Sequence, residues 1–348
     1  MRKVLLLLLI GLPHIAQDAP QMKTSEEITV ERILIDARVT LGNGDPVLGL
    51  TAKDFRVRVD GKPATVESIE WIPESSVARE LADIDKPAQQ EPEGVDIPEP
   101  QGRLIVVFFQ TDFSREDVRI RGQMKILSFA DDFVESLEPE DRVAVFSYDS
   151  HLKFRLDFTD RASDIKAAMR DCLAINEPPI PRAVPMPSLA RRLDRQAMKD
   201  AGSPEKALLL IGNALRPIPG PKSLLLFGWG LGRLSGDHIY LGKDYVFAER
   251  ALEASRTTVF ALDLTQADAH SLAAGLAAPA EATGGFYAET FHFPYLAMDR
   301  LKKTLSGHYE LEVRKPELKT KGVHDIEVEV VGHRGAEVMA RRTFIDKD

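Results

Sequence analysis

Cysteine is almost absent from this sequence, since Cys172 is the only one among 348 residues. A single cysteine excludes an intramolecular disulfide and a metal site built from several thiolates. Its apolar neighbour Leu173 favours a buried, small side chain over a nucleophile or an intermolecular bridge. The stability of the fold must therefore come from packing.

A basic surface and catalytic motifs are also missing. The chain has 45 Lys and Arg against 54 Asp and Glu, a net charge of -9. Nucleic-acid binding depends on clustered positive charge that releases counterions, so we expect no nucleic-acid partner. The sequence contains neither a His-Glu-x-x-His motif nor a Gly-x-Ser-x-Gly motif. We therefore predict a protein that is not an enzyme.

One hydrophobic run stands at the N-terminus and is short. Met1, Arg2 and Lys3 precede an apolar run over residues 4–12. This pattern is typical of a Sec-type signal peptide, which we place at residues 1–19, and it predicts a secreted or periplasmic protein. The run is about half of the ~20 residues that a spanning helix needs, so we expect no integral membrane span in the mature chain.

Both ends of the remaining chain have strand patterns. Apolar residues alternate with polar ones near the start, as at Ile33 and Ile35, and the pair Asp60-Gly61 predicts a hairpin. The C-terminal segment has strand patterns at 308–314, 324–331 and 337–344. Neither piece has enough strands to be stable alone, so we expect the two to fold together as one β-sandwich. We predict an N-terminal segment of this sandwich at 25–73, an acidic, proline-rich linker at 74–102 and a C-terminal segment of the sandwich at 307–346.

The middle of the chain, residues 103–306, alternates strands with helices. Continuous apolar runs predict strands buried on both faces of a parallel sheet, and runs with a spacing of three to four predict the helices that cover it. The predicted strands are 104–109, 142–148, 151–158, 223–227, 257–262 and 284–287. The predicted helices are 114–137, 164–173, 189–215 with a break near Gly202, 245–255, 271–283 and 296–306. The expected fold class is α/β, with a Rossmann-like, mostly parallel sheet inserted into the β-sandwich.

Several local phrases carry a resemblance to a known family. They are GLTAKDF at 49–55, DGKP at 60–63, DRVAVFS at 141–147, EATGG at 281–285, HYEL at 308–311 and ARRTF at 340–344. With the layout described above, the chain resembles the von Willebrand factor A-related proteins of acidobacteria over nearly its whole mature length. The resemblance implies a von Willebrand factor A-like domain at 103–306, and its better-studied relatives bind proteins through the top of that domain.

The resemblance also implies a divalent cation, held by Asp-x-Ser-x-Ser in a first loop, Thr in a second and Asp in a third. If Gln110 takes the leading position of the first loop, the anionic ligand is lost. If Asp112 takes it, Ser114 fits and Glu116 replaces the last serine. The second loop, 176–188, has no threonine, and the third, 228–232, has no carboxylate. We therefore expect a degenerate metal site and no cofactor, with Mg or Ca bound by Asp112, Ser114 and Glu116 as the alternative.

Three residues near the ends of strands are candidates for partner binding: Asp112, Trp229 and Asp263. The alternative interpretations are a tryptophan that covers the sheet for Trp229 and a turn cap for Asp263. The leading hypothesis is an exported, non-catalytic adhesion or scaffold module that binds a protein in the cell envelope or outside the cell. The alternatives are a divalent-metal-dependent binding module and a periplasmic enzyme that uses Asp112 and Asp263 as an acid and base pair.

Overall fold

The computed structural model describes residues 31–75, 102–111, 117–174, 176–185, 187–236, 238–266 and 270–346. The predicted signal peptide lies outside these residues, and so do Asp112, Ser114, Glu116 and nearly all of the predicted linker. The described residues from Arg32 onward belong to one compact unit.

A six-stranded sheet forms the centre of the α/β region of the chain. Its strands are β4 (Leu104–Gln110), β5 (Arg142–Tyr148), β6 (Leu152–Thr159), β7 (Lys222–Gly228), β10 (Thr257–Asp263) and β11 (Tyr287–Glu289). The strand order is β11-β10-β7-β4-β5-β6, and all neighbours are parallel except β5 and β6. Strands β4, β7 and β10 are buried at every position, as expected for a sheet covered on both faces. The predicted mostly parallel α/β sheet is confirmed.

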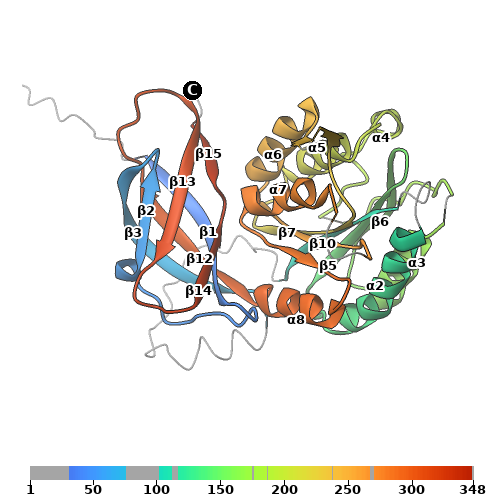
Figure 1. The fold of residues 1–348 in the computed structure, drawn as a ribbon, viewed down its shortest axis with the longest axis horizontal. Coiled ribbons are helices and arrows are strands. Elements are labelled where there is room, and N and C mark those ends of the chain that lie inside the picture. Colours follow the sequence, from blue (N-terminus) through green and yellow to red (C-terminus); the bar gives the residue numbers. More distant parts are fainter. Residues whose placement is uncertain are drawn as a thin grey trace, which may run out of the picture. The chain divides into compact units, whose positions relative to one another are not determined.

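Helices pack on both faces of this sheet (Figure 1). They are α2 (Asp117–Glu135), α3 (Ala162–Asp171), α4 (Arg195–Lys199), α5 (Pro204–Leu215), α6 (Lys243–Ala254), α7 (Ala273–Thr283) and α8 (Pro294–Thr304). Phe109 on β4 belongs to the core formed with α2, α3 and α8. Phe108 points to the other face, into the core formed with α4, α5, α6 and α7. Because successive side chains of β4 point to opposite faces of the sheet, this apolar strand contributes to two separate cores.

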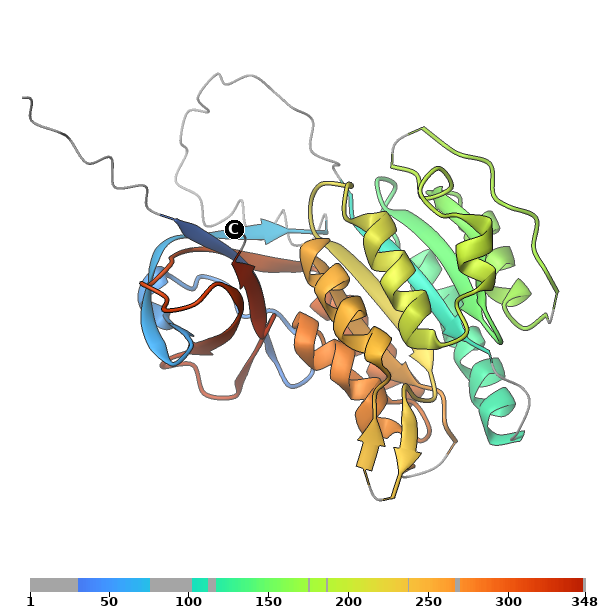
Figure 2. The same ribbon diagram turned by 90° about the horizontal axis from the view of Figure 1, so that it is seen from above.

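A seven-stranded antiparallel sheet combines strands from both ends of the chain (Figure 2). Its strands are β1 (Arg32–Leu41), β2 (Phe55–Val59), β3 (Lys62–Pro73), β12 (Gly307–Arg314), β13 (Gly322–Val330), β14 (Ala336–Ala340) and β15 (Thr343–Asp346), with a 3-10 turn η1 (Ala52–Asp54) before β2. The order is β14-β1-β12-β3-β2-β13-β15, so strands of the two segments interleave. The terminal segments therefore pair with each other, as predicted, but in one sheet, and the predicted sandwich is not confirmed.

The seven-stranded sheet curls around its own core. Alternate residues of β1 such as Ile35 and Ala37 face this core together with Tyr309 and Leu311 of β12. Because the sheet curls, β13 and β14 approach each other although they are not neighbours in the hydrogen-bonded order. One sheet thus encloses a core that usually needs two packed layers.

Some predicted elements differ from the observed ones. The expected strand at 337–344 is two strands, because the chain turns at Arg341 and Arg342. The predicted break near Gly202 in the region 189–215 is confirmed, since α4 ends at Lys199 and α5 begins at Pro204, but residues 189–194 are not helical. The predicted helix at 271–283, in contrast, agrees closely with α7, which continues past Pro279 to Thr283 and is followed by Gly284, whose φ of 77° is left-handed. The hairpin of β8 (Arg233–Ser235) and β9 (His238–Tyr240) was not predicted.

Two further observations are the burial of Cys172 and the length of the helices. Cys172 is fully buried, as predicted, and this burial raises the pKa of its thiol to about 12. Within the described residues, no helix is both long enough and apolar enough to cross a membrane.

Candidate functional site

The candidate site is the edge of the six-stranded sheet at which the parallel strands β4, β7, β10 and β11 end, here called the carboxyl edge. In open α/β sheets, loops that follow the strands at this edge provide binding residues. The predicted site residues Asp112, Trp229 and Asp263 follow or end β4, β7 and β10. Of the three, Trp229 and Asp263 are described.

Gln110, the last residue of β4, is 1% exposed and binds the loop that follows β7. Its Oε1 accepts hydrogen bonds from the main-chain N–H groups of Trp229 and Gly230, at 3.0 and 3.3 Å. Its Nε2 donates to the carbonyl of Gly230 at 2.8 Å. An amide can satisfy both kinds of partner, whereas an ionised carboxylate only accepts. Gln110 therefore holds the loop that follows β7 against the end of β4.

The first loop starts with Thr111, which is also bound within the chain. Its main-chain N–H and its hydroxyl both donate to the carbonyl of Tyr148, at the end of β5. The next residues, 112–116, lie outside the described portion of the chain, so the ligand alternative of Asp112, Ser114 and Glu116 and the Asp112–Asp263 acid and base pair remain predictions.

The glycines of the third loop serve close packing. A Cβ at Gly230, whose φ is 154°, would lie 2.4 Å from Cβ of Leu272. A Cβ at Gly232, whose φ is 78°, would lie 2.7 Å from the carbonyl oxygen of Tyr240. Glycine is the residue that accommodates both requirements. Trp229, between Gly228 and Gly230, is partly exposed at this edge.

Asp263, the last residue of β10, is 2% exposed and is hydrogen-bonded inside the chain. Its carboxylate accepts from the hydroxyl of Tyr287 at 2.6 Å, and Nε2 of His270 lies 2.5 Å from it. The main-chain N–H of Thr265 donates to its other oxygen at 2.9 Å. Burial alone would raise the pKa of Asp263, but these hydrogen bonds outweigh it and lower the pKa below its usual value.

This network fixes the chain around the end of β10. The main-chain N–H of Leu272 donates to Nδ1 of His270 at 3.3 Å, so Nε2 carries the proton that His270 shares with Asp263. The geometry at Thr265 is that of a turn cap. A direct contact of Asp263 with a partner stays a prediction, and the more exposed His270 is the side chain through which the network reaches the surface.

Aromatic side chains that the sequence analysis missed are exposed beside this network. Phe293, the N-cap residue of α8, is 58% exposed, and Tyr295 and the aliphatic Leu296 in the first turn of α8 are both 53% exposed. The rings of Phe293 and Tyr295 pack edge to face, 6.3 Å apart. Nζ of Lys125 on α2 donates to the carbonyl of Phe291 at 2.7 Å and ties the turn to the neighbouring helix. The run FHFPYL, aromatic but without helical or strand periodicity, was the pattern that could have identified this surface.

A second group of possible metal ligands lies away from this edge, near the start of β10. Among the described residues, ligand atoms of Asp36, His308 and Glu310 lie within 4.8 Å of one another. Nη2 of Arg256 donates to Asp36 at 2.5 Å and to Glu310 at 2.8 Å. The guanidinium therefore already provides the positive charge between the two carboxylates. Arg256 has a left-handed φ of 51°, a conformation common at the residue after a helix C-cap, which here is Ser255 of α6.

Comparisons with known proteins identify similar folds only. No family model matches the sequence, and no curated protein matches it. A von Willebrand factor type A protein from Catenulispora acidiphila is similar over 91% of this chain and 75% of its own, with 9% identity and a TM-score of 0.40. The conserved hypothetical protein BatB from Bacteroides thetaiotaomicron is similar over 59% of this chain and 98% of its own, with 14% identity and a TM-score of 0.39.

A third solved structure, the human COPII-coat protein Sec24c, is similar over 72% of this chain, with 11% identity and a TM-score of 0.38. The match spans 44% of the length of Sec24c. The topology defines this chain as a mixed α/β protein. One of its structural neighbours is a von Willebrand factor type A protein, while the acidobacterial type remains a prediction.

Proposed function

We propose that the chain is an exported, non-catalytic module that binds another protein through the carboxyl edge of a von Willebrand factor A-like domain. In this proposal the domain, residues 103–306, is inserted between the two groups of strands that form the seven-stranded sheet. The metal site that such domains use is degenerate here. The N-terminal pattern of residues 1–19 supports export to the periplasm or the cell exterior.

The observation that carries the proposal is the position of Gln110. Gln110 ends β4 and is, with Asp112, one of the two candidates for the position at which the resemblance implies an aspartate; its amide bonds both to N–H groups and to a carbonyl of the third loop. The third loop itself has no carboxylate. Oxygen ligands of a divalent cation come mainly from carboxylates, so an amide at the end of β4 and a third loop without a carboxylate support binding without an ion.

The exposed side chains at the carboxyl edge support a protein partner. Trp229 is partly exposed, and Phe293 and Tyr295 are more than half exposed. Aromatic residues are enriched among the residues that contribute most to protein interfaces. Exposed apolar patches also mark such interfaces.

A titration with divalent cations tests the absence of an ion. We expect the melting temperature of the chain to be the same in EDTA, in MgCl₂ and in CaCl₂. A bound ion at a hundredfold excess over its Kd would stabilise the fold by about 2.7 kcal/mol. A rise in melting temperature that depends on the cation concentration would contradict the proposal and favour the metal-dependent module.

Affinity capture from the cell envelope tests the proposed surface. We expect Trp229→Ala and Phe293→Ala to reduce recovery of the same captured protein while the melting temperature stays unchanged. Leu41→Ala is the matched control, because Leu41 is 41% exposed and lies on β1, outside the carboxyl edge. Equal recovery with all three variants would exclude the carboxyl edge as the binding surface.

A further inference from the structure

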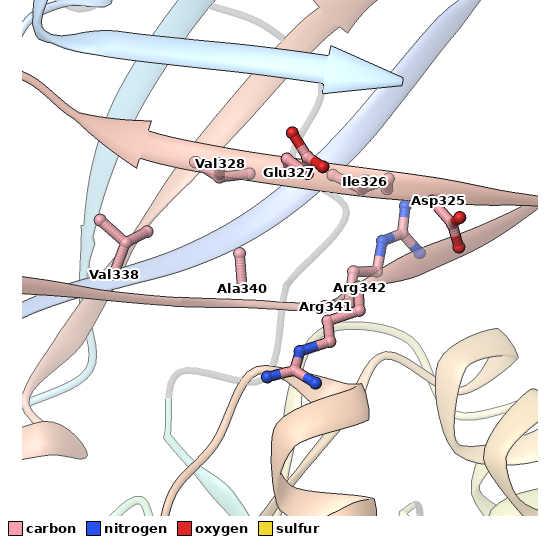
Figure 3. Close-up of a pocket in the computed structure, with 8 residues that line it drawn as sticks. All are labelled: Asp325, Ile326, Glu327, Val328, Val338, Ala340, Arg341 and Arg342. Carbon is pink, nitrogen blue, oxygen red and sulfur yellow. The ribbon is translucent and has the colours of Figure 1, made fainter. Parts of the chain in front are cut away.

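A cavity of about 410 Å³ lies in the seven-stranded sheet, between β13 and β14 (Figure 3). Val328 of β13 and Val338 and Ala340 of β14 line it, together with Asp325 and Glu327. Its volume is within the range of ligand-binding pockets. It lies in a region of the chain that the proposed function does not use.

The turn at Arg341 and Arg342 creates this cavity. Strand β14 pairs with β1, whereas β15 pairs with β13 over Gly322–Asp325 only. The main-chain N–H of Ile326 still donates to the carbonyl of Arg342 at 2.6 Å. Beyond that bond, no main-chain hydrogen bond between described residues joins β13 to β14. Two strand edges therefore face each other across the cavity, which we call the β13–β14 slit.

The main-chain direction along β13 follows from its hydrogen bonds. The carbonyl of Asp325 accepts from the main-chain N–H of Asp60, and the N–H of Val331 donates to the carbonyl of Asp54. The main-chain N–H and C=O groups of the odd-numbered residues of β13 are therefore directed to β2 and η1. The main-chain N–H of Ile326 is directed to the opposite side, away from β2. Because the main-chain groups alternate along a strand, those of Val328 and Val330 are directed into the slit. They form an edge that another strand can pair with.

The side chains of the slit separate into an apolar floor and an acidic rim. Val328, Val338 and Ala340 pack against the core of the seven-stranded sheet and are only partly buried. Asp325, Glu327 and Glu329 on the outer face of β13 are exposed. The cation nearest to Glu327 in an ion pair is Arg58, at 3.7 Å, and both side chains are more than half exposed. Figure 3 shows Arg342 beside Asp325 at one end of the slit, with Arg341 pointing away.

We propose that the β13–β14 slit binds a short, extended peptide segment of a partner, in which apolar residues alternate with Lys or Arg. The peptide adds a strand against Val328 and Val330, since main-chain pairing of this kind is an established mode of peptide recognition. Its apolar side chains complete the core over Val338 and Ala340. Its basic side chains lie beside Glu327 and Glu329, where cross-strand opposite charges are favourable.

The ends of the slit limit the length of the bound segment. The bond from Ile326 to Arg342 closes one end, and the connection 331–335 between β13 and β14 closes the other. The open edge of β13 runs from Val328 to Val330, about 10 Å at ~3.3 Å per residue. About three residues of the peptide therefore lie within the slit.

Fluorescence anisotropy with labelled synthetic peptides tests this proposal on the full chain. The probe is a six-residue peptide of alternating Lys and Val. Three controls are a Glu and Val alternation, a sequence with three Lys followed by three Val, and the probe N-methylated at its valines. We expect saturable binding of the probe, weakened by salt, and at least about tenfold weaker binding of each control. The proposal would be overturned if the probe bound no more tightly than the control with three Lys followed by three Val, or if no peptide bound at all.

Charge reversal tests the rim. We expect Glu327→Lys with Glu329→Lys to weaken probe binding about tenfold. The matched control is Glu70→Lys with Glu317→Lys, which makes the same change in net charge at exposed positions of the chain outside the slit. Equal weakening by the two pairs would show that the peptide responds to net charge alone and would overturn the proposed site.

Amide hydrogen exchange locates the bound peptide independently of any substitution. We expect the probe to slow exchange at Val328 and Val330, whose N–H groups are directed into the slit. Exchange at Glu327 and Glu329, which are directed to β2, stays unchanged. Unchanged exchange at Val328 and Val330 in the presence of a bound probe would overturn the proposal. A failure of the carboxyl edge in the capture experiment leaves this result unaffected, because the two surfaces share no residue.

Discussion

The two sheets of the protein bury their apolar residues in different ways. The six-stranded sheet has helices on both faces, and its polar groups at the carboxyl edge, such as Gln110 and Asp263, are hydrogen-bonded within the chain. The seven-stranded sheet curls around one core and leaves Val328 and Val338 partly exposed at an open edge. The first sheet is therefore covered on both faces, whereas accessible main-chain groups are found in the second.

The largest expected effect concerns the core of the six-stranded sheet. Phe227 is fully buried and stacks on Phe109, with ring centroids 4.7 Å apart. We expect Phe227→Ala to lower the free energy of unfolding by about 3–5 kcal/mol, because it leaves a cavity. Denaturant unfolding measures the change. Leu234→Ala, at a 52% exposed position, is the control and should change it by less than about 0.5 kcal/mol. A loss of similar size in the free energy of unfolding of both variants would contradict the expected difference between the buried Phe227 and the exposed Leu234.

The second effect is the sensitivity of the seven-stranded sheet to acid. Burial alone would raise the pKa of Glu74, but the charge of Arg38 and the hydrogen bond from His308 lower it from 4.5 to about 2. A lowered pKa stabilises the fold at pH values above 4.5, and this stabilisation is lost as the pH falls towards 2. The shift corresponds to about 3 kcal/mol.

Unfolding of the wild type and of Glu74→Gln at a series of pH values measures this contribution. We expect the wild type to lose stability between pH 4.5 and about 2, and the variant to lose less over the same interval. Amide exchange should show the loss first in β1 and β12, which hold Arg38 and His308. Identical pH profiles for the two proteins would exclude Glu74 as the acid-sensitive group.

A smaller effect is expected at the carboxyl edge. Gln110→Glu keeps the size of the side chain but loses the donor to the carbonyl of Gly230. We expect a loss of about 1–3 kcal/mol in the free energy of unfolding, the usual range for a buried polar group that loses its partner. Thermal unfolding in EDTA measures it. Unchanged stability would mean that the amide does not hold the loop after β7 against the end of β4.

The smallest effect is expected at the exposed aromatic turn. Phe293→Ser should change the free energy of unfolding by less than about 0.5 kcal/mol, since Phe293 is 58% exposed. Denaturant unfolding of the variant measures the change. A clear loss of stability would assign Phe293 to the core and remove it from the proposed interface.

The sequence alone determined the elements that depend on local patterns. Continuous apolar runs identified the strands that became β4, β5, β7 and β10, since burial on both faces removes polar residues from a strand. The alternation at Ile33 and Ile35 identified β1. The Asp60-Gly61 pair identified a hairpin, where both residues have positive φ. These features arise from the steric and hydrophobic preferences of neighbouring residues.

The tertiary structure alone decided which strand edges stay unpaired and which polar groups are hydrogen-bonded within the chain. Nothing in residues 337–344 shows that the chain turns at Arg341, because both halves have a strand pattern and differ only in their partners, β1 and β13. The role of Gln110 depends on a loop 119 residues further along the chain. Such outcomes follow from contacts between distant segments, and local sequence preferences do not encode them.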